Sequence, residues 1–274
     1  VDYGDPKMKF LDGSDAVDRD VNVITPGKFF ENRYSIKSDI YSQEQNDFIK
    51  KTIENVFKVT YDAVYGDHND LRANPYKTID TSGNIVFDNT IATSREAVER
   101  VIDLQSLVDT YILNEICMDM DVGWSSFRMS YDAGEKGKRK LTFEAPWDWD
   151  SALGYSVWNT KILLCANAYK GGGTPGNKQN IWLLVLVGQD WFWQEVYAKW
   201  SQVKEAGAFD EAIRRMDLHI ATYKTYRDAD NELWVNAGGD SRGTNDSSVE
   251  TLKNWLNERI AWLDGEFERL GKNK

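Results

Sequence analysis

The chain has 274 residues, of which 41% are hydrophobic and 13% aromatic, and its formal net charge is −11. This apolar content suffices for a sizeable core, which excludes a disordered chain, and the length suits one large domain or two small ones. The acidic balance argues against nucleic acid and anionic membrane surfaces as steady partners, and the lack of an apolar run of about 18 residues excludes a membrane-spanning helix.

The first 40 residues are patterned as short strands, whereas the remainder is patterned mainly as helices. Residues 7–11, 21–24 and 33–36 are strand-like and are separated by Asp, Gly and Pro. We therefore divide the chain into a small β-rich portion, residues 1–40, and a mainly helical portion, residues 41–274.

Residues that commonly cap helices open the first helical segments. Ser42, with Gln45 three positions later, forms a capping pair, Thr93 or Ser94 opens a short helix, and Asp103 opens a longer one. Residues 66–81 are predicted to be a loop, and residues 157–166 suit either helix or strand. The predicted helices are residues 42–65, 93–101, 103–116, 180–187, 190–200, 208–221, 223–233 and 247–270.

The sequence predicts a hairpin between two acidic stretches. Residues 125–131 and 140–143 have strand character, and the polar, Gly-containing residues 132–139 between them suit a hairpin tip. Because a hairpin brings its two ends together, we expect the acidic stretches that flank it to lie within a few ångströms of each other.

The acidic stretches contribute Asp119 and Asp121 before the hairpin, and Asp148 and Asp150 after it. Four carboxylates in one place repel one another, and a divalent cation with hard oxygen ligands, Mg²⁺ or Mn²⁺, offsets that repulsion. The alternative interpretation is that these aspartates are solvated turn residues and helix caps.

The same stretch resembles the core signature of a known family. NEICMDMDVGWSSF at residues 114–127, PWDWD at residues 146–150 and then Gly154 are similar to the signature of the CotH (spore coat protein H) kinase family, and weaker similarity continues to residues 255–262. The resemblance implies an α+β, protein-kinase-like fold: a small β-rich N-terminal portion, then a mainly helical lobe with an inserted β-hairpin. Residues 1–40 would be the remnant of a small lobe whose first part this chain lacks.

The resemblance also implies an activity. Members of this family transfer phosphate from ATP to Ser or Thr of a protein substrate, with Mg²⁺ or Mn²⁺, and the implied location is the spore coat or the cell surface. The Lys and Glu that a kinase small lobe supplies to the nucleotide phosphates are not assigned to any residue of this chain.

The resemblance gives roles to individual residues. Asp121 resembles the catalytic-loop Asp, which orients the acceptor hydroxyl and accepts its proton. Asp148 resembles the metal-binding Asp, with Asp150 as an alternative or second ligand. Ser126, five positions after Asp121, stands where kinases have Asn and can still bind Mg²⁺. Asp119 is either a further metal ligand or a turn cap.

Several neighbouring residues have two interpretations. Trp147 and Trp149 either hold the acidic turn rigid by packing or bind the nucleotide by stacking on its adenine or sugar. Glu115 is interpreted as a charge on the helix surface. The Gly-rich residues 169–178 are interpreted as a surface loop, because they lack the Gly-Lys-Ser/Thr ending of a phosphate-binding loop.

Two other functions remain open at this point. The Ser at position 126 and the missing small-lobe residues also suit a catalytically impaired, pseudokinase-like binding or scaffold module. Paired carboxylates among 11 tryptophans also suit a glycoside hydrolase, which needs no metal.

The remaining features exclude other kinds of site. Cys117 and Cys165 both lie in apolar runs and are interpreted as buried thiols rather than as a disulfide. Two histidines are too few for a His-rich zinc site. No signal peptide is evident from Val1 onward, and the absence of an initiator Met suggests that a leader was removed or the chain trimmed.

Overall fold

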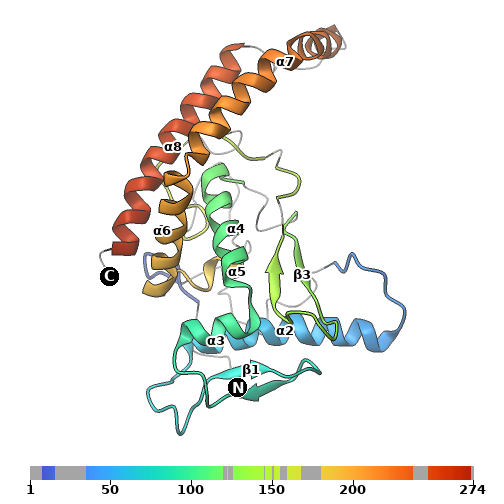
Figure 1. Ribbon diagram of the computed structural model, residues 1–274, viewed down its shortest axis with the longest axis vertical. Coiled ribbons are helices and arrows are strands. Elements are labelled where there is room, and N and C mark those ends of the chain that lie inside the picture. Colours follow the sequence, from blue (N-terminus) through green and yellow to red (C-terminus); the bar gives the residue numbers. More distant parts are fainter. Residues whose placement is uncertain are drawn as a thin grey trace.

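The structure is a computed structural model that shows a mixed α+β, mostly helical chain with two small antiparallel sheets (Figure 1). The α+β class is therefore confirmed. In the described ranges, no helix is both long and apolar enough to span a bilayer. The residues that the structure describes are 8–15, 35–119, 122, 126–144, 146–149, 151–154, 159–167, 180–236 and 246–272.

Helices α2 and α3 begin where the sequence predicts. Helix α2 spans Gln43–Tyr65, and the Ser42 side chain accepts a hydrogen bond from the backbone N–H three residues on. Helix α3 spans Ser94–Val101 and begins with a complete capping box between Thr93 and Glu96. Each cap satisfies backbone N–H groups that have no partner within the helix, which fixes the helix start.

A small sheet packs against α2 where the sequence analysis predicted a loop at residues 66–81. Strand β1 (Lys77–Ile79) pairs antiparallel with β2 (Ile85–Phe87), and the sheet lies below α2 in Figure 1. The loop prediction is confirmed for residues 66–76 and wrong for residues 77–79, because a strand of only three residues leaves too short a pattern to recognise. The available signal was the turn, in which the Asp80 carboxylate accepts the backbone N–H of Asn84.

Helix α4 (Leu104–Cys117) is the centre of the core, and helix α6 (Asp190–Glu205) packs beside it (Figure 1). Tyr111 of α4 makes edge-to-face contacts with Phe192 and Trp193 of α6, with ring centroids 5.2 and 5.7 Å apart. All three rings are fully buried. Such pairs contribute about 0.5–1.5 kcal/mol each beyond their buried area, so they hold α4 rigidly in the core.

Helices α7 (Ala208–Asn236) and α8 (Asp246–Lys272) form an antiparallel pair that projects beyond the core (Figure 1). An ion pair between Lys253 of α8 and Asp217 of α7, 2.8 Å long, links them. The outer part of α7 exposes the large apolar side chains of Leu218, Tyr223, Tyr226, Leu233, Trp234 and Val235.

Some predicted helix boundaries were wrong. Residues 208–221 and 223–233 form one helix rather than two, since Thr222 continues it and donates its hydroxyl to the Leu218 carbonyl at 2.7 Å. Helix α5 covers Ile181–Leu184, shorter than the predicted 180–187, and the chain then turns.

The strands predicted within residues 1–40 are not observed as strands or lie outside the described residues. In residues 8–11, the described part of the first, Lys9 forms an isolated antiparallel bridge with Asp15, and there is no strand. Residues 21–24, much of 33–36 and the Gly-rich segment lie outside the described residues. In the range 159–167 the chain is turns, neither helix nor strand. The division at residue 40 stays a prediction.

Candidate functional site

The predicted hairpin is present and is fixed against α4. Strand β3 (Met129–Tyr131) pairs antiparallel with β4 (Leu141–Phe143). The backbone N–H of Phe143 donates to the Ser106 hydroxyl in the first turn of α4 at 3.0 Å. The hairpin therefore runs beside the helix that carries the first acidic stretch, and its second strand leads toward the second.

The chain segments that flank the hairpin meet, as the sequence analysis expected. The Ser126 hydroxyl lies 3.4 Å from Oδ2 of Asp148. Beyond the second acidic stretch, the backbone N–H of Leu153 donates to the carbonyl of Cys117 at the end of α4, at 2.7 Å. These two contacts join the hairpin ends to each other and to the end of α4.

The turns at this site have strained backbones. Non-glycine residues rarely adopt a left-handed conformation, which costs about 1–2 kcal/mol at each position. Strained residues of this kind persist where the surroundings fix them, and they cluster at functional sites. Within the described ranges, five non-glycine residues have positive φ, and apart from Arg139 at the hairpin tip they lie here: Met118 (52°), Ser126 (60°), Asp148 (62°) and Leu153 (57°).

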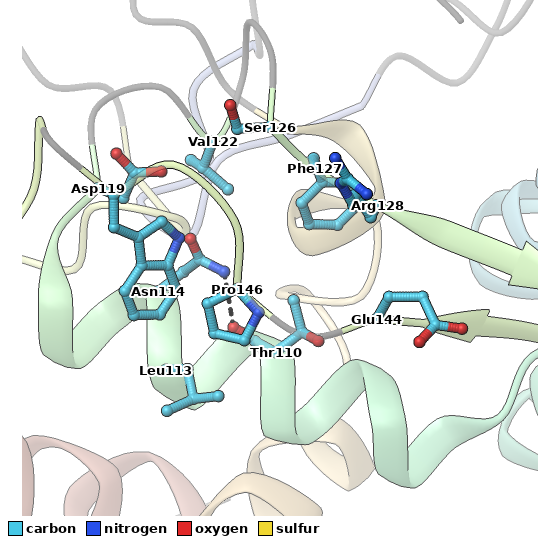
Figure 2. Close-up of a pocket in the computed structure, with 11 residues that line it drawn as sticks. Thr110, Leu113, Asn114, Asp119, Val122, Ser126, Phe127, Arg128, Glu144 and Pro146 are labelled. Atoms are coloured by element: carbon cyan, nitrogen blue, oxygen red, sulfur yellow. Dashed lines mark hydrogen bonds between the residues drawn. The ribbon is translucent and has the colours of Figure 1, made fainter. Parts of the chain in front are cut away.

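A small pocket lies between α4 and these turns, and Asp119 is its buried acidic residue (Figure 2). Asp119 is 1% exposed and follows Met118, whose left-handed conformation ends α4. Figure 2 shows Asp119 and Ser126 along one edge of the pocket and Leu113 on the α4 side. The lining residues are Thr110, Leu113, Asn114, Asp119, Val122, Ser126, Phe127, Arg128, Glu144, Pro146 and Trp149.

Asn114 adds a buried acceptor to this pocket. Its amide Nδ2 donates to the Thr110 carbonyl at 2.9 Å, the dashed line in Figure 2. Its Oδ1 has no hydrogen-bond partner among the described residues, although the side chain is 4% exposed. A buried acceptor of this kind is costly unless a donor or a cation reaches it, so the pocket is suited to a ligand of that kind.

The charge of Asp119 affects the pKa of the neighbouring Cys117 thiol. Burial, and then the negative charge of Asp119, raise the pKa of Cys117 to about 12, with Arg259 opposing them. Both cysteines are free thiols. The prediction that they are buried is confirmed for Cys165, whereas Cys117 is partly buried.

The side-chain oxygens at this site are of the chemical type that binds hard divalent cations. The carboxylates of Asp119 and Asp148 and the hydroxyl of Ser126 are ligands that Mg²⁺ and Mn²⁺ prefer. Within the described part of the chain, no three His, Cys, Asp or Glu side chains gather as a metal-binding group. Asp121 and Asp150, which the sequence analysis added to the cluster, lie outside the described residues.

Glu115 is fully buried, so the expectation that it is a surface charge was wrong. Its carboxylate accepts hydrogen bonds from the Tyr111 hydroxyl and from the backbone N–H groups of Leu164 and Cys165, each at 2.9 Å. It also pairs with Arg259 of α8 at 2.9 Å. With its acceptor positions filled in this way, Glu115 is a structural anchor rather than a catalytic acid.

Arg259 ties three segments together from inside the core. It is 0% exposed and donates to the backbone carbonyls of Glu115, Thr160 and Ile162 as well as to the Glu115 carboxylate. The sequence analysis missed it because 144 residues separate the partners. A signal was present, since Arg259 lies midway between the buried Trp255 and Leu263 at helical spacing.

The two tryptophans of the second acidic stretch lie in different surroundings. Trp147 is 54% exposed, and the guanidinium of Arg128 lies 3.7 Å from its ring centroid. Trp149 is half-buried and lines the pocket. Trp147 therefore packs against Arg128 with about half of the residue exposed, so both interpretations of it stay predictions, while Trp149 is placed to contact a molecule in the pocket.

Comparison with known proteins adds a family to this geometry. The family model described as CotH kinase protein matches residues 20–263, which is most of the chain. Neither the curated proteins nor the solved structures yielded a match. The match supports a kinase-like protein and gives no support to the glycoside hydrolase interpretation.

Proposed function

The chain belongs to the CotH kinase family, and on this premise we propose that it transfers the γ-phosphoryl group of ATP to Ser or Thr of a protein. The observation that carries the proposal is the 3.4 Å contact between Ser126 and Asp148, which brings together the chain segments on either side of the hairpin. Phosphoryl transfer needs positioning and charge neutralisation more than covalent chemistry. Clustered oxygen donors at the end of a rigid helix suit that task.

Each residue of the set has a role in the proposal. Asp148 and Ser126 would hold Mg²⁺ or Mn²⁺, with Asp119 and Asp150 as further ligands. A bound cation neutralises charge on the phosphate oxygens. Asp121 orients the acceptor hydroxyl, whose oxygen bonds to the γ-phosphorus while the bond to the bridging oxygen breaks. ADP leaves, and the hydroxyl proton passes to Asp121.

The partners follow from the same reaction. Trp149, and Trp147 at the rim, are proposed to contact the nucleotide by stacking on its base or sugar. The second substrate is a protein with an accessible Ser or Thr. A location at the spore coat or cell surface is proposed from family membership.

Replacing Asp121 by Asn tests the proposal. General-base positioning contributes about 10²–10⁴-fold, so Asp121→Asn should lower transfer of labelled phosphate from ATP to protein at least 100-fold with an unchanged melting temperature. Asp230→Asn is the matched control, because Asp230 is exposed on α7, away from the hairpin ends. Transfer by Asp121→Asn at the rate of the unaltered chain would refute the role of Asp121.

A second candidate is a pseudokinase-like binding module. Ser126 occupies the position of the kinase Asn, and its hydroxyl lies against Asp148. A Ser hydroxyl binds a metal ion more weakly than the amide oxygen of the kinase Asn does. The weaker metal site favours nucleotide binding over phosphate transfer. Calorimetry of Mg²⁺·ATP separates the candidates: binding without any phosphate transfer supports the module, and binding with transfer supports the kinase.

A further inference from the structure

Arg128 is a cation at the pocket that the proposed mechanism does not use. It precedes β3 and lies across the hairpin from Glu144, whose backbone N–H donates to the Arg128 carbonyl at 2.9 Å. Its side chain is exposed and lines the pocket that also contains Asp119 and Ser126. Figure 2 shows its guanidinium at the pocket, beside Phe127.

No carboxylate among the described residues forms an ion pair with Arg128. Glu144, its cross-strand neighbour, also lines the pocket, but its carboxylate accepts the hydroxyl of Ser130 instead. Oppositely charged residues that face each other on a hairpin usually pair. The guanidinium here lies over the ring of Trp147 instead, so its charge is available to a ligand.

Stacking on Trp147 orients this charge without using up its donors. The guanidinium carbon is 3.7 Å from the ring centroid, so a face of the planar group contacts the indole. The N–H groups lie in the guanidinium plane and point outward from its edge, where they match two oxygens of a phosphate. A guanidinium already held in place loses less conformational entropy when it binds, which favours affinity.

We propose that Arg128, held on the ring of Trp147, binds a phosphate group of the nucleotide. This inference rests on the proposed function and adds to it a residue that recognises phosphate on the hairpin side of the pocket. The group that Arg128 binds is an oxyanion because a guanidinium has hydrogen-bond donors and no acceptor. The carboxylates of Asp119 and Glu144 line the same pocket and repel anions, so a phosphate there needs a cationic contact of this kind.

The test is calorimetry on the full chain with Mg²⁺·ADP and, separately, with Mg²⁺·pyrophosphate. Arg128→Gln should weaken both ligands at least tenfold, because a charge-assisted bidentate contact is lost. Arg128→Lys should weaken both by less. Trp147→Leu should weaken pyrophosphate, which has no base or sugar to stack on an indole, because the guanidinium loses its support. Lys136→Gln is the matched control, since it removes a positive charge from the exposed tip of the same hairpin.

The outcomes separate this inference from the proposed function. If the unaltered chain binds ADP and Arg128→Gln binds it equally well, Arg128 is no phosphate ligand and the proposed kinase survives. A loss of ADP affinity with pyrophosphate affinity unchanged would assign Arg128 to the base or sugar and overturn the inference. If the unaltered chain binds neither ligand, the proposed function itself fails.

Discussion

Replacing Arg259 by Met should be among the most damaging single changes in this fold. The change removes the cationic partner of Glu115 while keeping an unbranched side chain of similar length in the core. Glu115 keeps its hydrogen bonds from Tyr111, Leu164 and Cys165, but its charge becomes an uncompensated charge in a fully buried position. The backbone carbonyls of Thr160 and Ile162 lose their donor as well.

The size of the effect follows from the burial of both partners. Removing one member of a buried ion pair costs about 3–5 kcal/mol, because the remaining charge is left without compensation. That is a large part of the 5–15 kcal/mol by which a typical domain is stable. Arg269→Met on the same helix is the matched control. Arg269 pairs with Glu266 near the surface, at 56% side-chain exposure, so this change should cost less than about 1 kcal/mol.

The effect should also depend on pH in a defined direction. Burial raises the pKa of Glu115, while Arg259 and the hydrogen bonds lower it. Without Arg259 the pKa in the folded state rises further above the value in the unfolded chain. The folded variant then binds more protons than the unfolded one, so its stability is retained below the unfolded pKa and falls as pH rises toward the folded pKa.

Urea unfolding followed by circular dichroism measures this directly. The deficit of Arg259→Met against the unaltered chain should grow between pH 5 and pH 8, by at most about 1.4 kcal/mol per pH unit. Adding Glu115→Gln should remove the pH dependence, since the titrating group is gone. A stability deficit below about 1 kcal/mol, or one that stays constant with pH, would show that Glu115 does not become an uncompensated buried charge when Arg259 is replaced.

Two further predictions concern the thiols and the turn after the second acidic stretch. Burial raises the pKa of Cys117 to about 12 and that of Cys165 well above its usual value, so Ellman's reagent at pH 8 should titrate neither thiol in the folded chain and both after denaturation. Fast modification of the folded chain would contradict the burial. Gly154→Ala should destabilise by about 1–2 kcal/mol, since Gly154 has φ +85° and a Cβ there would lie 3.1 Å from the Trp255 indole. Gly188→Ala is the control, because a Cβ at that position meets nothing within 4 Å. Equal melting temperatures for the two variants would show that neither the positive φ of Gly154 nor its contact with Trp255 constrains this position.

Local signals in the sequence located the parts of the fold that depend on neighbouring residues. Ser42, Thr93 and Asp103 each mark a helix start, because the cap and the first turn lie within four residues of each other. The hairpin was predictable for the same reason, since its strands and its tip are contiguous. Its prediction carried the most structural information, because it implied that the two flanking acidic stretches approach each other.

Interactions between distant segments were not predictable in the same way. Glu115 was assigned to the surface because a charged residue near a helix end usually is, and its partner Arg259 is 144 residues away. Arg128 was passed over because its significance depends on Trp147, which lies on the other side of the hairpin. The helical spacing around Arg259 was a local signal that this side chain is buried, but the spacing does not identify Glu115 as its partner.

The structure links the buried ion pair to the acidic turns. Four left-handed residues at the site, at about 1–2 kcal/mol each, oppose folding by an amount comparable with a large share of the stability of a domain. Such turns persist only if their ends are held, and Arg259 holds the carbonyl of Glu115 before the first turn and the carbonyls of Thr160 and Ile162 after the second. The core between α4 and α8 therefore does more than stabilise the chain: it holds the ends of the left-handed turns at Met118, Ser126 and Asp148, which their local sequence would not favour by itself.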